Sequence, residues 1–226
     1  MTHPPYPGPP AAPDALPPPP QGQPGAVAST HGLAVGAALT AIVVTVIEVV
    51  EVPLAWAAQD AYLEAADAGK SALDVWTAYD TFGLPWFLAV IASFVVTCIW
   101  LTRVRTNVEL TRPEVNHARS KGWVWGGWIV PIVSLWFPFQ IIRDVTQPLR
   151  QALSIGFLGW WWAFWLLGTF ASQIGPRLTG FGEINTSAVA ALGWAEGVNA
   201  ALTVVALILW LVVIRRIDDQ QRAERP

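Results

Sequence analysis

The sequence has little charge. Asp, Glu, Lys and Arg make up 13% of its 226 residues, whereas a soluble domain carries about a quarter. Hydrophobic residues make up 54%, so too few polar side chains remain to cover a surface that faces water. The apolar residues also occur in runs long enough for a helix to cross a bilayer. These shortages exclude an ordinary soluble domain and predict an all-α integral membrane protein.

Cysteine is also scarce, because Cys98 stands alone inside an apolar run. One thiol cannot form a disulfide within the chain, so it gives no information on the redox compartment. Residues 1–30 contain no Lys or Arg and no apolar stretch, and we therefore expect no secretory signal. No cysteine stands in a lipidation motif.

Motifs for catalysis or cofactor binding are missing. His3, His31 and His117 are scattered along the chain and show no metal-ligand spacing. We find no phosphate-binding loop, nucleophile elbow or HExxH sequence. The net charge of -3 says little about partners, and no feature indicates nucleic acid. The sequence therefore predicts no enzyme, no metal and no cofactor; a membrane enzyme or a sensor is an alternative that no motif supports.

Proline dominates the beginning of the chain. Eleven of residues 1–25 are proline, which removes backbone donors and prevents helix formation. We expect a disordered, polyproline-II-like arm over 1–30. Two interpretations of this arm stay open: a solvated tail, or a ligand for a proline-binding protein module.

Four apolar stretches are predicted to cross the membrane as a helical bundle. They cover about 33–58, 84–102, 156–175 and 188–214, close to the ~20 residues that a spanning helix needs. The second helix should begin near Pro85, since proline suits a helix start, and should end before Pro113. The helical membrane domain then covers 31–216, and a charged cytoplasmic tail covers 217–226.

Two further segments are expected beside these spans. Acidic residues recur at helical spacing within 60–80, which predicts an amphipathic helix at the outer end of the bundle. Segment 122–142 contains four tryptophans but is interrupted by glycines and prolines. Because indole prefers the headgroup region, we expect an interfacial or re-entrant helical segment there. We call 122–142 the Trp/Pro segment.

The distribution of Lys and Arg favours four crossings over five. If the Trp/Pro segment crosses, six basic residues of the spans and loops lie inside and seven outside, which shows no bias. If it does not cross, eleven lie inside and only Lys70 and Arg177 lie outside. Basic residues concentrate in cytoplasmic loops. We therefore expect a multi-pass protein of the cell membrane with both termini in the cytoplasm.

The stretch 94–145 has the features of a known family. An apolar helix ends at Trp100 and leads into Arg103, Arg105 and Asn107. The later motif residues are Gly122, Trp123, Trp128, Ile129, Val130, Pro131, Ile132, Trp136, Pro138, Gln140, Arg143, and the run Trp160, Trp161 and Trp162. The chain resembles the actinobacterial membrane family called domain of unknown function 4328 over about 31–216. It departs from that pattern at Ile129, where an aromatic is usual, and at Ser134, where Asn is expected. The resemblance implies a membrane location and this architecture, and no activity.

Three carboxylates lie inside the apolar spans: Glu48, Glu51 and Glu196. Each would cost about 2.5–3.5 kcal/mol if charged at the membrane centre, so such residues usually face the bundle interior. Glu48 and Glu51 share a helical face, as do Glu196 and Asn199. We predict that these four residues lie at similar depth and form a polar site for a proton or a cation. Hydrated carboxylates near the interface are the alternative.

A second group of candidate residues lies on the predicted inner face. It consists of Arg103, Arg105, Asn107 and Arg143, with Trp128 and Pro131 in the neighbouring Trp/Pro segment. Basic groups there attract anionic lipid headgroups by about 1 kcal/mol each. A sharper hypothesis is that Arg103, Asn107 and Arg143 hydrogen-bond the Trp/Pro segment to the second span.

Two functions follow from these observations. The favoured one is a non-catalytic scaffold or interaction component of the membrane, with the lipid bilayer and a protein partner of the arm as its partners. The alternative is an ion- or small-solute-handling protein that uses Glu48, Glu51 and Glu196. The chain shows no internal repeat of the kind found in many transporters, although an oligomer would be able to build a path between subunits.

Overall fold

The computed structural model describes residues 27–150, 152–179 and 182–223, and within them the chain forms helices and no strands. The predicted arm over 1–30 therefore lies almost entirely outside the described residues. The longer helices are α1 His31–Asp67, α2 Ala78–Thr111, α4 Phe137–Thr146, α5 Ile155–Ala171 and α8 Leu192–Ala223. The short elements are η1 Ala72–Asp74, α3 Trp123–Ile129, η2 Val133–Leu135, α6 Gly175–Thr179 and α7 Thr186–Val189.

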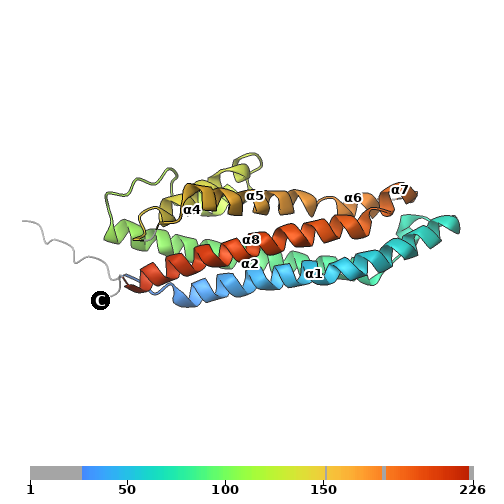
Figure 1. Ribbon diagram of the computed structural model, residues 1–226, viewed down its shortest axis with the longest axis horizontal. Coiled ribbons are helices and arrows are strands. Elements are labelled where there is room, and N and C mark those ends of the chain that lie inside the picture. The colour runs from blue at the N-terminus through green and yellow to red at the C-terminus, as the bar shows by residue number, and fades with distance from the viewer. Residues whose placement is uncertain (1–26, 151, 180–181, 224–226) are drawn as a thin grey trace, which may run out of the picture.

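α1, α2, α5 and α8 lie roughly parallel to the long axis of the molecule and alternate in direction (Figure 1). α1 packs between α2 and α8, and α5 packs on the other side of α8. Across the bundle the helices are therefore ordered α2, α1, α8, α5. α3 and α4 lie near one end, where α3 contacts α2 and α4 contacts α5. α1 begins and α8 ends at this same end, which we call the terminal end; the opposite one is the loop end.

Three of the four predicted spans coincide with helices of membrane-spanning length. α1, α2 and the stretch Thr186–Ala223 are each long and apolar enough to cross a bilayer. α5 is apolar but has 17 residues, fewer than the ~20 that a hydrocarbon core requires. The helix within the predicted span 156–175 is therefore shorter than expected, because it ends at Ala171.

Large apolar side chains cover the outside of all four long helices. Val43 on α1, Phe87 on α2, Trp160 on α5 and Ile208 on α8 are each at least half exposed. Glutamates and an asparagine are buried between the same helices. A surface of this kind suits a hydrocarbon solvent and would be unfavourable in water.

The predicted amphipathic helix over 60–80 is wrong. α1 continues to Asp67, and the chain then leaves the helix through Gly69, whose φ of +68° favours glycine. Capping boxes start two new elements, Ser71 with Asp74 for η1 and Thr77 with Asp80 for α2. The acidic spacing looked helical because it combines the end of one helix with the caps of the next two.

The ends of the other spans also differ from expectation. α2 starts at its Thr77 cap, so Pro85 lies inside the helix and does not begin it. The same helix ends at Thr111, as predicted from Pro113. α8 continues to Ala223, and residues 217–223 of the expected tail are therefore helical, with Ile217 and Gln221 buried.

The Trp/Pro segment is broken, as its glycines and prolines predict. It forms α3, a turn, η2 and the start of α4. At the turn, Val133 N donates to Pro131 O over 2.7 Å, and Ile132 between them has φ of +66°. This is a γ-turn of the rare positive-φ kind, in which a β-branched residue is strained.

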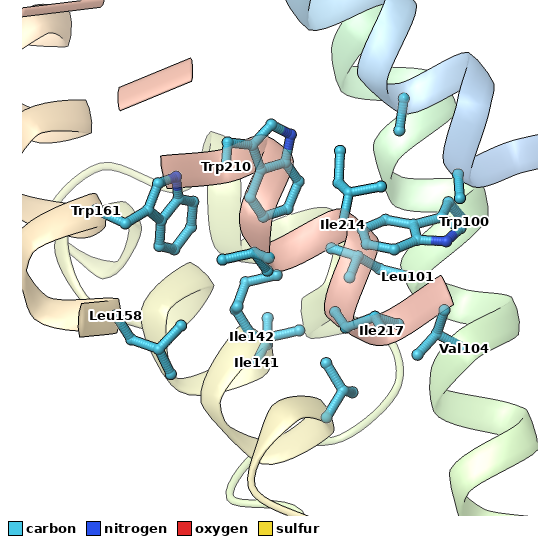
Figure 2. Packing of buried hydrophobic residues seen from close by; sticks show 14 of the residues in the cluster. Trp100, Leu101, Val104, Ile141, Ile142, Leu158, Trp161, Trp210, Ile214 and Ile217 are labelled. Atoms are coloured by element: carbon cyan, nitrogen blue, oxygen red, sulfur yellow. The ribbon is translucent and has the colours of Figure 1, made fainter. Parts of the chain in front are cut away.

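Tryptophans fill the core at the terminal end (Figure 2). Trp161 of α5 stacks on Trp210 of α8, and Trp100 of α2 meets the same ring edge-on. Ile142 of α4 and Ile217 of α8 are fully buried beside them. This packing connects the Trp/Pro segment and the three long helices into one body.

Candidate functional site

The structure brings the four predicted intramembrane residues into the interior of one region. Glu48, Glu51, Glu196 and Asn199 are each no more than 9% exposed. The carboxyl groups of Glu48, Glu51 and Glu196 lie near one another. We call these three glutamates the carboxylate cluster. The i,i+3 spacing on α1 and α8 thus predicts the buried faces of both helices correctly.

Two donors on α2 reach the cluster. The Tyr79 hydroxyl donates to Glu196 Oε1 over 2.7 Å, and Trp86 Nε1 donates to Glu48 Oε1 over 3.0 Å. Tyr79 and Trp86 are seven residues apart, which places them on one helical stripe two turns from each other. α2 therefore satisfies one carboxylate from α1 and one from α8.

Two buried polar atoms in and beside the carboxylate cluster lack a hydrogen bond of good geometry. They are Glu48 Oε2 and Asn199 Oδ1, as judged within the described part of the chain. No Lys, Arg or His among the described residues forms a salt bridge with the three glutamates. An unpartnered polar atom costs about 1–3 kcal/mol when buried, and a charged group costs more. Such atoms mark a place where a ligand or a proton can be bound.

A cavity of about 480 Å³ opens beside Glu48. It lies between α1, α2, α5 and α8, with the end of α3 at one side, and it is partly open to the outside. Its polar edge includes Glu48, Thr45 and Thr203. Seven aromatic side chains contribute to the rest of the wall: Trp86, Phe94, Trp128, Trp161, Phe164, Trp165 and Trp210.

Gly175, at the start of α6, closes the other side of the carboxylate cluster. A Cβ at this position would collide with the Glu196 carboxylate and would lie 2.8 Å from the Tyr79 hydroxyl. A larger residue at this position would therefore have to displace the Glu196 and Tyr79 side chains from their present positions.

The second predicted group does not form one site. Arg103 is exposed on α2 and Pro131 is exposed in the Trp/Pro segment. Arg105 is buried and donates to Glu109 Oε1 over 3.0 Å. Arg143 donates to its neighbour Asp144, and Trp128 lines the cavity. These residues are spread over the terminal half of the bundle.

Asn107 contradicts the hypothesis that it holds the Trp/Pro segment. Its Nδ2 donates to Ala28 O over 2.9 Å and to Gln221 Oε1 over 2.6 Å, and its Oδ1 accepts from Ala28 N over 3.1 Å. It therefore connects α2 to the segment before α1 and to the end of α8. The spacing of residues along α2 gives no information on partners 79 and 114 positions away.

Loop 112–122, and not Asn107, hydrogen-bonds the region of α4 at the end of the Trp/Pro segment. Ala118 N donates to Asp144 Oδ2 over 2.7 Å, and Arg119 Nε donates to Gln140 Oε1 over 2.8 Å. The Arg119 guanidinium also lies 3.8 Å from the centre of the Phe137 ring. Burial lowers the pKa of His117 in this loop, and the nearby Arg105 guanidinium lowers it further. The loop is thus folded against α4.

The sequence did not reveal Tyr79 and Trp86. Both are amphipathic aromatic residues in a chain that has many of them, so residue type alone does not distinguish them. Their i,i+7 spacing places two polar tips on one stripe, and this was the available signal. That signal becomes specific only when the partners on α1 and α8 are known.

The chain matches the model of one protein family. The family model described as Domain of unknown function (DUF4328) matches residues 65–219, more than half of the sequence. The chain belongs to this family. The DUF4328 match confirms the resemblance seen in the Arg, Asn and Trp motifs, and it includes Tyr79, Trp86, Glu196 and Asn199. Glu48 and Glu51 lie before the matched region. Neither the curated proteins nor the solved structures gave a match.

Proposed function

We propose that this DUF4328 protein crosses the cell membrane four times, through α1, α2, α5 and α8, and binds a small solute beside Glu48. The alternating directions of the four helices support this topology. So does the count of eleven basic residues on one side against two on the other. Both termini then lie in the cytoplasm.

The observation that carries the solute-binding proposal is a buried glutamate in the wall of an aromatic cavity. A volume of about 480 Å³ falls within the ~300–1,000 Å³ of ordinary small-molecule sites. Such sites combine apolar walls with a few polar groups that orient the ligand. Glu48 and Thr203 supply those groups here. This arrangement favours the solute-handling alternative over a purely structural role.

Saturable photolabelling tests this proposal. Adamantyl diazirine, an apolar probe of suitable size, would be added to the protein in lipid vesicles, and labelled residues mapped by mass spectrometry. We expect unlabelled adamantane to reduce labelling at cavity residues such as Phe94 and Trp165. Labelling of lipid-facing residues such as Leu88 should stay constant.

A matched pair of variants controls this experiment. Ser93→Phe adds a ring inside the cavity, whereas Ala92→Phe adds the same ring to the exposed face of α2. Saturable labelling should disappear in the first variant and persist in the second. If the parent protein shows no saturable component at any cavity residue, the cavity is not a solute site.

A scaffold role is the second candidate, and one observation favours it. Asn107 and Gln221 fix the chain at Ala28, immediately before α1. The proline-rich arm would then leave the body at a defined point on the cytoplasmic side. A protein partner of the arm and anionic lipid near Arg103 stay predictions.

A further inference from the structure

We infer that the solute is an organic cation with a hydrophobic body, whose positive charge lies against Glu48. This inference rests on the proposed function and adds the chemical class of the ligand. It follows from three properties of the region: a buried carboxyl group without a basic partner, a wall rich in aromatic rings, and a donor arrangement unsuited to a metal ion.

The carboxyl groups of the region have no basic partner, which favours a cationic ligand. Three glutamates are buried together, and within the described residues no basic side chain forms a salt bridge with any of them. Glu48 is 5% exposed, and its Oε1 accepts from Trp86. Its Oε2 has no hydrogen bond of good geometry, although the Thr203 side chain lies near the carboxyl group. A carboxylate away from water is stabilised by an opposite charge at short distance. An ionised Glu48 would repel an anionic ligand.

The wall of the cavity suits an organic cation. Seven aromatic side chains line the space, and the faces of indole rings attract ammonium groups through the quadrupole of the ring. The same rings bury the hydrophobic part of a ligand that enters from the bilayer. A neutral hydrocarbon would use the rings but would leave Glu48 unpaired.

An inorganic cation fits less well. Metal ions of the calcium or magnesium type need several oxygen ligands converging on one point. Within the residues that the structure describes, no group of three or more His, Cys, Asp or Glu is close enough to hold a metal. A carboxyl group beside aromatic rings is an arrangement that suits an alkylammonium group.

Two probes of equal shape test the role of charge. Phenyltrimethylammonium is a permanent cation, and tert-butylbenzene has a carbon in place of its nitrogen. Each would be titrated into the 5-fluorotryptophan-labelled protein in zwitterionic nanodiscs, and the fluorine NMR signals of Trp86 and Trp165 followed. We expect the cation to bind at least about tenfold more tightly than the hydrocarbon, as a desolvated cation contact implies.

Two variants assign that difference to Glu48. Glu48→Gln keeps the size of the side chain and an acceptor for Trp86 Nε1, so we expect it to weaken binding of the cation and thereby remove the preference for it. Glu64→Gln removes an exposed carboxylate from the same helix and should keep the preference. Size-exclusion chromatography reports whether each variant is folded.

The outcomes separate the inference from the proposed function. If tert-butylbenzene binds as tightly as the cation, the inference is wrong and the solute-binding proposal stands. If neither compound changes the Trp86 or Trp165 signals, both are wrong. Should Glu48→Gln fail to fold, the comparison of the two probes on the parent protein still decides the question.

Discussion

Asn107 connects three parts of the chain that are far apart in sequence. It is 1% exposed and hydrogen-bonds the backbone of Ala28 and the side chain of Gln221. A buried amide with several partners fixes the positions of those partners, because each of them loses its hydrogen bond if the amide is removed. At the scale of single residues, Asn107 determines where the segment before α1 is held.

Replacing Asn107 by alanine should release that segment. The change leaves Ala28 N, Ala28 O and Gln221 without their partner, and we expect it to lower the free energy of unfolding by about 1–3 kcal/mol. Thermolysin cleavage within 27–34 should become faster in detergent solution. Asn116→Ala, at an exposed loop position, is the matched control. Equal cleavage rates in the parent and in Asn107→Ala would contradict this role.

At the scale of elements, the Trp/Pro segment is held by contacts from both sides. Trp162 Nε1 donates to Leu135 O over 2.8 Å, and Cys98 Sγ donates to Val124 O over 3.3 Å. The segment reverses direction at Ile132, whose side chain is 69% exposed. The γ-turn there exists because the surrounding contacts hold both of its ends.

Ile132→Gly should therefore leave the protein at least as stable as the parent. Glycine adopts the positive φ without strain, and relief of about 1–2 kcal/mol offsets the greater entropy of the unfolded chain. Ile129 is similarly exposed, at 67%, but lies in α3. Ile129→Gly should lower stability by about 1 kcal/mol. Urea unfolding in detergent measures both variants, and a less stable Ile132→Gly protein would argue against strain at this turn.

At the scale of the whole molecule, apolar side chains lie outside and the carboxylate cluster lies inside. This distribution minimises the cost of charged groups in hydrocarbon, since each glutamate is covered by protein. The short helices α3 and α4 lie toward the terminal end of the bundle (Figure 1). The proposal of four crossings with a non-crossing Trp/Pro segment rests on this position.

Cysteine labelling distinguishes four crossings from five. Ser120→Cys and Gln147→Cys introduce thiols at exposed positions before and after the Trp/Pro segment. With four crossings, an impermeant maleimide should label both in inverted vesicles and neither in intact cells, whereas Lys70→Cys should label in intact cells. The parent is the control, because its Cys98 is 0% exposed. Labelling of Ser120→Cys and Gln147→Cys from opposite sides would mean that the segment crosses.

Local patterns predicted the faces of the long helices well. The i,i+3 pairs on α1 and α8 identified Glu48, Glu51, Glu196 and Asn199, and all four are buried. The same reasoning failed at 60–80. The acidic residues there belong to the end of α1 and to two capping boxes, and together they happen to have the spacing of a single helix. Helical spacing describes one element at a time and cannot report where that element stops unless the cap residues are read with it.

By itself, the sequence determined the membrane character, the all-helical class, the broken Trp/Pro segment and the burial of the glutamates. These properties follow from composition and from the cost of placing polar groups in hydrocarbon, which act on each residue locally. Only the tertiary structure decided that Tyr79 and Trp86 satisfy Glu196 and Glu48, that Asn107 holds Ala28, and that a cavity opens beside Glu48. Those features depend on how distant helices pack, and the spacing of residues within one helix contains no information about the neighbour that will face it.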